Sequence, residues 1–146
     1  MTPRIHNPFK AMPEGLKAMM AIETSIAASG IEHSLLELVK MRASQINGCA
    51  FCLHMHSTDA RAHGESEMRL YMLTAWRESS LYSERERAAL AWTEALTRVA
   101  ETGAPDADFA LLVAERHIGA FIAEVREHDY GQIVVDIACE LRSESV

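Results

Sequence analysis

Residues 31–64 read IEHSLLELVKMRASQINGCAFCLHMHSTDARAHG, and both halves of this stretch have the pattern of a helix. The first half, residues 31–46, repeats side chains at the three- and four-residue spacing of one helical face. Asn47 and Gly48 form a strong turn signal that ends this helix. The second helix is expected over residues 49–63, so the stretch predicts two antiparallel helices joined by a tight connection. The face of the first helix consists of Leu35, Val39, Arg42, Ala43 and Ile46, widened by Leu38.

Helical patterns continue on both sides of this pair, and strand patterns are nearly absent. Ser83 and Glu86 have the spacing of a capping box, which marks the start of a helix that is expected to continue through Ala100. Residues 1–15 contain three prolines and no periodicity, so we expect them to form an arm that packs on something else. The other expected helices cover residues 14–29, 67–76 and 132–141, together with a segment capped by Asp106. The fold class is therefore all-α, with a single domain over residues 1–146.

The chain has 146 residues, a length typical of one domain. Apolar residues make up 49% and charged residues 24%, close to the average globular protein, which argues against a disordered or fibrous chain. No segment approaches the roughly 18 consecutive apolar residues of a membrane span, and the N-terminus lacks the apolar core of a signal peptide. A net charge of −7 disfavours binding to nucleic acid or to an anionic membrane. These features predict a cytoplasmic protein with no membrane or nucleic-acid partner.

Two of the three cysteines, Cys49 and Cys52, form a C-x-x-C motif directly after the Asn-Gly turn. If a helix begins there, both sulfurs lie in its first turn, where unpaired N–H groups and the helix dipole favour thiolate over thiol. The three-residue spacing puts the sulfurs on one face, close enough for a disulfide after modest adjustment. In a reducing compartment, such a pair is typical of redox or metal chemistry.

His56 lies four residues after Cys52 and therefore on the same helical face. Its imidazole can take the thiol proton or deliver a proton to a leaving oxygen. Glu37 lies on the preceding helix, and the antiparallel arrangement lets it reach His56 directly or through one water. The three side chains would form a Glu–His–Cys relay in which the carboxylate orients the imidazole and the imidazole activates the thiol.

Residues 37–64 contain the pattern E-x2-K-x-R-x-S-x-x-N-G-C-x-x-C-x3-H, followed by D-A-R-x-x-G. This combination closely resembles the alkylhydroperoxidase D core of the carboxymuconolactone decarboxylase family and is far more specific than C-x-x-C alone. A weaker likeness extends over residues 13–127. The resemblance implies a helical bundle that assembles into trimers or hexamers. It also implies thiol-dependent reduction of hydrogen peroxide or alkyl hydroperoxides, with no cofactor or metal.

The resemblance also implies a role for each site residue. Cys52 corresponds to the peroxidatic cysteine, which becomes a sulfenic acid, and Cys49 to the resolving cysteine, which condenses with it to a disulfide. An external dithiol or dithiol protein then reduces the disulfide. Glu37 and His56 correspond to the proton relay. The helix dipole by itself favours Cys49 as the more reactive thiolate, whereas adjacency to His56 and the family both favour Cys52, and we adopt Cys52.

The chain departs from other members of this family at two places. Phe51 stands between the cysteines where some members have a histidine, so no role of that histidine is transferred. Residues 133–146 read IVVDIACELRSESV, whereas many relatives end in a helix with an Asn-Ala-Trp-Asn-Arg-like segment. The resemblance therefore predicts no packing for the C-terminal segment.

Other interpretations use the same residues. Cys49 and Cys52 are alternatively buried structural thiols, or zinc ligands together with His56 and His63, although the seven-residue separation of the histidines strains a tetrahedral site. The same dithiol suits a disulfide reductase that acts on a protein partner. A lactone decarboxylase of the same family needs no redox-active thiols. Cys139 is most simply a small buried apolar residue.

Overall fold

The computed structural model describes residues 7–114, and this part of the chain consists of helices without a strand. The helix predicted over residues 132–141 lies outside the described residues, as does Cys139. The elements are α1 (Pro8–Ala11), α2 (Pro13–Ala28), α3 (His33–Asn47), α4 (Ala50–Ala62), α5 (Glu67–Met72), the 3-10 helix η1 (Leu73–Ala75), α6 (Glu84–Thr97), α7 (Val99–Thr102) and α8 (Asp106–Ala114). The prediction of an all-helical fold is confirmed for the described residues.

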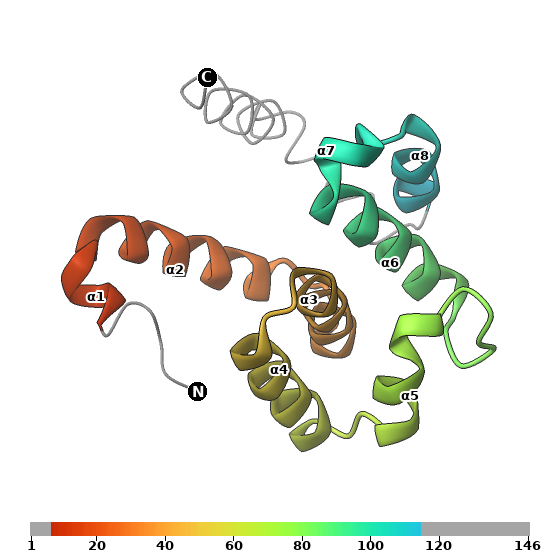
Figure 1. Cartoon of the computed structure of the whole chain (residues 1–146), viewed down its shortest axis with the longest axis horizontal. Coiled ribbons are helices and arrows are strands. Elements are labelled where there is room, and N and C mark those ends of the chain that lie inside the picture. The colour runs from red at the N-terminus through yellow and green to blue at the C-terminus, as the bar shows by residue number, and fades with distance from the viewer. Residues whose placement is uncertain (1–6, 115–146) are drawn as a thin grey trace.

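Helix α3 is the central element, because it packs against α4 as well as against α6 (Figure 1). The side chains of Leu38 in α3, Leu73 in η1 and Leu90 in α6 are completely buried where these elements meet. Each such leucine contributes about 1.5–3 kcal/mol of burial free energy. Helix α8 packs on α6 and adds Leu112 to a second cluster that contains Leu35. The core therefore fixes both sides of the helix that carries Glu37.

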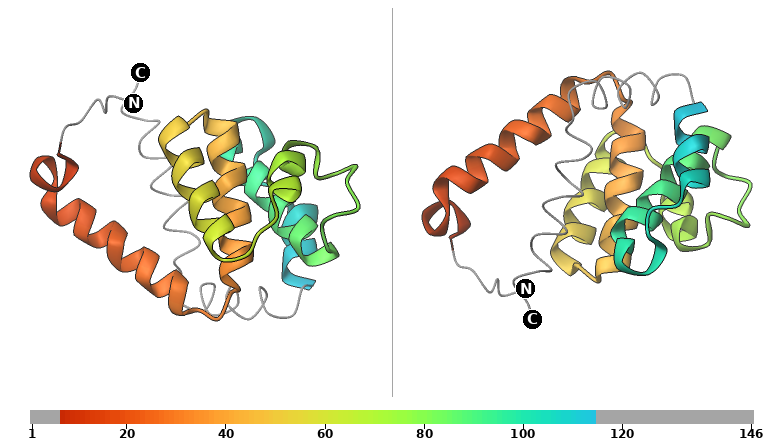
Figure 2. Two further views of the ribbon diagram at one scale, coloured as in Figure 1. Left: turned by 90° about the horizontal axis from the view of Figure 1, so that it is seen from below. Right: turned by 90° about the horizontal axis from the view of Figure 1, so that it is seen from above.

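The connection between α3 and α4 has the conformation that the Asn-Gly signal predicted. Gly48 has φ +62° and ψ +29°, the left-handed conformation in which glycine carries no steric penalty. The Cys49 N–H then donates to the Ser44 carbonyl at 3.1 Å. The turn brings α4 back alongside α3, and both views of Figure 2 show the two helices side by side. The predicted antiparallel helix pair is confirmed.

A buried ion pair joins α3 to α6. Glu94 accepts hydrogen bonds from Arg42 Nε at 2.7 Å, from Trp76 Nε1 at 2.8 Å and from Arg77 at 2.9 Å. Burial alone would raise the pKa of the Glu94 carboxyl, but these three donors together hold its pKa below the ordinary value. The side chains of Arg42 and Glu94 are 11% and 13% exposed, so this pair is part of the core rather than a surface contact.

The capping box predicted at the start of α6 is present. The Glu86 amide donates to Ser83 Oγ, and the Glu86 carboxylate accepts from the Ser83 amide at 2.8 Å. Arg69 of α5 binds the same carboxylate at 2.5 Å and Glu65 at 2.8 Å. Tyr82 donates its hydroxyl hydrogen to the Arg69 carbonyl. These bonds fix α5 against the start of α6.

Three predicted boundaries are wrong. The helix expected through Ala100 ends at Thr97, because Arg98 leaves the helical conformation and the Thr102 hydroxyl donates to the Ala95 carbonyl at 2.6 Å. The helix expected over residues 67–76 is α-helical only to Met72 and continues as the 3-10 turn η1. Asp106 lies inside the first turn of α8 rather than before it.

Helices α1 and α2 project away from the remaining helices (Figure 1). The arm expected over residues 1–15 therefore includes the short helix α1 and the start of α2. No residue of α2 is buried, and Met19, Met20 and Ile22 are more than half exposed. An ion pair of 2.8 Å between Glu23 and Lys40 joins α2 to α3. Among residues 7–114, no helix combines the length and the apolar character that crossing a membrane requires.

Candidate active site

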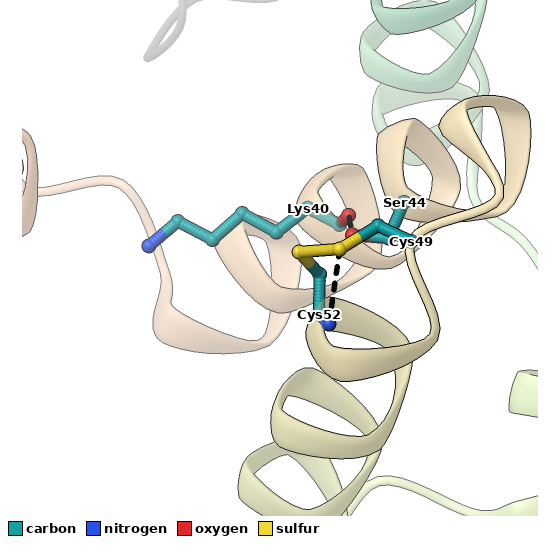
Figure 3. Close-up of a disulfide and its surroundings, with 4 residues drawn as sticks. All are labelled: Lys40, Ser44, Cys49 and Cys52. Carbon is teal, nitrogen blue, oxygen red and sulfur yellow. Dashed lines mark hydrogen bonds between the residues drawn. A yellow bond between two sulfur atoms is a disulfide. The ribbon is translucent and has the colours of Figure 1, made fainter. Parts of the chain in front are cut away.

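The two cysteines of the C-x-x-C motif lie at the N-terminus of α4 and are joined by a disulfide (Figure 3). Cys49 is the N-cap of α4, and its sulfur accepts a hydrogen bond from the Cys52 amide at 3.3 Å. The Cα atoms are 5.4 Å apart, within the normal range for a disulfide. The pair is thus close enough to cycle between disulfide and dithiol, and the first turn of α4 provides an N–H group for a negative charge on Cys49.

Ser44 holds the turn at Gly48 and Cys49 against the end of α3. Its hydroxyl donates to the Lys40 carbonyl at 2.7 Å, and its own carbonyl accepts from the Cys49 amide at 3.1 Å. Ser44 is buried, and Figure 3 shows it next to Cys49. Sequence reasoning gave this residue no role. The available signal is that a serine inside a helix often donates to the carbonyl four residues before it.

Glu37 and His56 are in direct contact across the α3–α4 interface. The Glu37 carboxylate lies 2.9 Å from His56 Nδ1, and the two side chains are 7% and 14% exposed. An ionised carboxylate has no proton to donate, so Nδ1 is the donor. This arrangement leaves Nε2 as the ring nitrogen that can exchange a proton with a reactant. The direct contact between the two residues that the sequence predicted is present.

His56 and Cys52 share one face of α4, because four residues separate them along the helix. Both are partly accessible to solvent, whereas Glu37 behind them is buried. Glu37 is therefore the inner group of the three, and His56 and Cys52 lie closer to solvent on the same face of α4. A carboxylate that fixes the tautomer of an imidazole beside a sulfur can support proton transfer during thiol chemistry.

Exposed apolar side chains lie next to the disulfide. Phe51, between the two cysteines, is 63% exposed, and Met55 is 38% exposed. A cavity of about 310 Å³ lies on another side of α4, between this helix and α5. Its lining includes Leu53, His54 and Ser57.

His63 does not join the cysteines. Its Nδ1 donates to the Asp59 carbonyl at 2.8 Å, and its ring stacks on His33 with the ring centres 4.0 Å apart. In the part of the chain from residue 7 to residue 114, no three His, Cys, Asp or Glu side chains are gathered as metal ligands. The zinc interpretation placed His63 with Cys49 and Cys52, and this arrangement is absent from the described residues. The stacking of His63 on His33 was not predicted, because it depends on the packing of α3 against α4.

The sequence profile of the carboxymuconolactone decarboxylase family matches residues 13–95, which include both cysteines, Glu37 and His56. The chain belongs to the carboxymuconolactone decarboxylase family. The match extends from α2 almost to the end of α6, so it covers the complete helix pair that carries the site.

Two known proteins are similar to this chain over two thirds of its length or more. The uncharacterized protein YdfG of Bacillus subtilis (strain 168) is 46% identical over 98 residues, which is 67% of each chain. The crystal structure of ATU0492 from Agrobacterium tumefaciens has a TM-score of 0.72 and 44% sequence identity, and the match covers 89% of this chain and 94% of that one. ATU0492 is described as a protein of unknown function for which the role of antioxidant defence protein AhpD has been suggested. The resemblance to alkylhydroperoxidase D proteins is confirmed at the level of the family and the fold.

Proposed function

We propose that this chain is a thiol-dependent peroxidase that reduces hydrogen peroxide or alkyl hydroperoxides with the Cys49–Cys52 pair. The observation that carries the proposal is the Glu37–His56 contact of 2.9 Å on the same helix pair as a disulfide at the start of α4. A redox-active sulfur pair and an oriented imidazole are the two components that peroxide reduction by thiols requires.

The proposed cycle has three steps, and each step conserves atoms and electrons. The Cys52 thiolate attacks the O–O bond of ROOH, forms Cys52–SOH and releases RO⁻, which takes one proton to become ROH. The Cys49 thiol then condenses with Cys52–SOH, which forms the disulfide and releases one water. An external dithiol finally reduces the disulfide through a mixed disulfide and is itself oxidised, so that two electrons pass from the dithiol to the peroxide.

His56 is the proposed proton donor and acceptor of this cycle, and Glu37 is its positioning residue. The Glu37 carboxylate keeps the hydrogen on Nδ1, so Nε2 takes the proton of the thiol and returns it to the departing alkoxide. The two sulfurs are assigned by adjacency, since Cys52 shares a helical face with His56 whereas Cys49 is the N-cap. Cys52 is therefore the proposed peroxidatic cysteine and Cys49 the proposed resolving one.

The test is peroxide consumption with excess dithiothreitol by the wild type, Cys52→Ser, Cys49→Ser and the matched control Cys139→Ser. We expect turnover by the wild type and by the control, no turnover by Cys52→Ser, and a single oxidation without turnover by Cys49→Ser. Sulfenic acid trapped with dimedone should appear on Cys52 of the Cys49→Ser variant. Peroxide turnover that survives in Cys52→Ser would contradict the assignment. Decarboxylation of a lactone substrate that survives in the double Cys49→Ser, Cys52→Ser variant would indicate a decarboxylase instead.

A second candidate function is a disulfide reductase acting on a protein partner. The observation in its favour is the 63% exposure of Phe51, an aromatic residue that stands between the two cysteines in the sequence. Aromatic residues are enriched where proteins dock. A reduced protein that does not consume peroxide but reduces the disulfides of insulin would support this function in place of the first.

We also propose that the protein acts as a homotrimer or homohexamer in the cytoplasm. The exposed apolar residues of α2 support an assembly, because an isolated helix of this length is marginally stable without packing. The reducing cytoplasm supports a disulfide that is continually re-reduced. Light scattering that gives a monomer at micromolar concentration would contradict the assembly.

A further inference from the structure

Lys40 is positioned at the level of the dithiol by the register of the helix pair. Glu37 contacts His56, and the Ser44 carbonyl contacts the Cys49 amide, so seven residues of α3 match seven residues of α4 in the opposite direction. Lys40, three residues after Glu37, is therefore level with Leu53 of α4, the residue after Cys52. Glu37, Lys40 and Ser44 also share one face of α3, because they are three and four positions apart. Figure 3 shows Lys40 in the surroundings of the disulfide, with its ammonium group pointing away from it.

In this disulfide state the Lys40 ammonium binds another partner. Its Nζ lies 2.8 Å from the Glu23 carboxylate of α2, and the side chains of Lys40 and Glu23 are 29% and 52% exposed. The other cation of this part of α3, Arg42, is bound to Glu94 in the core. Glu37 and His56 of this interface are hydrogen-bonded to each other.

Reduction changes the charge at the dithiol. When an external dithiol breaks the Cys49–Cys52 bond, it supplies two electrons and is oxidised to its own disulfide. One sulfur of the chain takes a proton, and the other remains as a thiolate at a pH near neutrality when its surroundings favour the charged form. The site thus gains one negative charge that is absent from the disulfide. A lysine has a long flexible stem, and an exposed ion pair such as that with Glu23 holds it only weakly.

We propose that Lys40 stabilises the thiolate of the reduced Cys49–Cys52 pair, and that Glu23 competes with the thiolate for the Lys40 ammonium. In the disulfide state the Lys40 ammonium is bound to Glu23, and after reduction it binds the thiolate sulfur. Lys40 then acts on the two cysteines through its charge. The Glu23–Lys40 ion pair, which joins α2 to α3, weakens when the disulfide is reduced. This inference rests on the proposed function in one respect only, which is that the Cys49–Cys52 disulfide can be reduced.

The alternative is that Lys40 and Glu23 only hold α2 in place. In that case, removing either partner has the same effect on α2 and none on the thiols. In our proposal the two substitutions act on the thiols in opposite directions, because Lys40→Met removes the cation and Glu23→Gln releases it. Lys40→Arg retains the charge and is the matched control.

The test uses the full-length protein, reduced with dithiothreitol and freed of it, without any peroxide. The rate of alkylation by iodoacetamide is measured against pH, and mass spectrometry identifies the cysteine that reacts. For Lys40→Met we expect the midpoint of the pH profile to rise by roughly 0.5–1 pH unit, so that alkylation below the midpoint slows about 3- to 10-fold. Lys40→Arg should stay within about twofold of the wild type, and Glu23→Gln should have an unchanged or lower midpoint.

A second readout is the equilibrium between the disulfide and dithiothreitol. Loss of thiolate stabilisation disfavours the reduced form, so Lys40→Met should shift this equilibrium towards the disulfide by a similar factor of about 3–10. An unchanged midpoint in Lys40→Met, or equal upward shifts in Lys40→Met and Glu23→Gln, would overturn the proposal. Thermal unfolding establishes that each variant is folded, and Lys40→Gln replaces Lys40→Met if the latter is not. Failure of the peroxide assay leaves these outcomes unaffected, so the two proposals fail separately.

Discussion

Replacing Glu37 by Gln removes the negative charge that lies 2.9 Å from His56 Nδ1 while it keeps the length of the side chain. A hydrogen bond to a charged group contributes about 1.5–3 kcal/mol, compared with about 1 kcal/mol for a neutral pair. The difference of about 0.5–2 kcal/mol corresponds to a roughly 2- to 30-fold loss in rate if the charge acts in the transition state. The loss is larger if the amide NH₂ turns towards Nδ1, because Nδ1 then accepts a hydrogen bond and Nε2 carries the proton.

The assay is the rate at which the reduced protein consumes peroxide in a single turnover, measured from pH 5 to pH 9. Glu37→Gln should lower this rate at least about 2-fold near neutral pH, with the two cysteines still forming a disulfide afterwards. Glu67→Gln is the matched control, because Glu67 is 50% exposed and binds Arg61 on the surface. Thermal unfolding separates a catalytic effect from a loss of folding. A wild-type rate in Glu37→Gln, with Cys52→Ser inactive, would refute the relay but not the dithiol.

Three further substitutions and one titration test the site and the fold. His56→Ala should slow the thiolate step about 10²- to 10⁴-fold, measured in the same single-turnover assay, because it removes the proton-transfer group. Glu94→Ala should lower the free energy of unfolding by about 3 kcal/mol in urea, since it leaves Arg42 buried without its partner. Gly48→Ala should cost about 1–2 kcal/mol in the same assay because of the positive φ. Hydrogen bonds hold the carboxyl pKa values of Glu86 and Glu94 below the ordinary value despite burial, which by itself raises them. Their contribution to stability is therefore full above that ordinary pKa and is lost as the pH falls through the lowered values, which a series of urea midpoints between pH 7 and pH 3 would show.

The sequence by itself determined the helix pair and the place of the cysteines in it. The Asn47-Gly48 turn, the periodic apolar residues of α3 and the capping box at Ser83 are local signals, since each acts within about one or two helical turns. The position of Cys49 and Cys52 at the start of α4 follows directly from that turn. The likeness of residues 37–64 to the alkylhydroperoxidase D core could also be recognised from the sequence, because the motif is continuous in the chain.

Only the tertiary structure decided which side chains meet across the helices. The sequence allowed Glu37 to reach His56, 19 residues away, directly or through one water, and the register between α3 and α4 decided for the direct contact. The contact between Arg42 and Glu94, 52 residues apart, depends on the register between α3 and α6 and was not predicted. A helix fixes the face on which a residue lies but not the level at which a neighbouring helix presents its partner. The position of Lys40 beside the dithiol depends on that register in the same way. Local periodicity does not contain the register, because it is set by the burial of Leu38 of α3, Ala60 of α4 and Leu90 of α6 in one shared core.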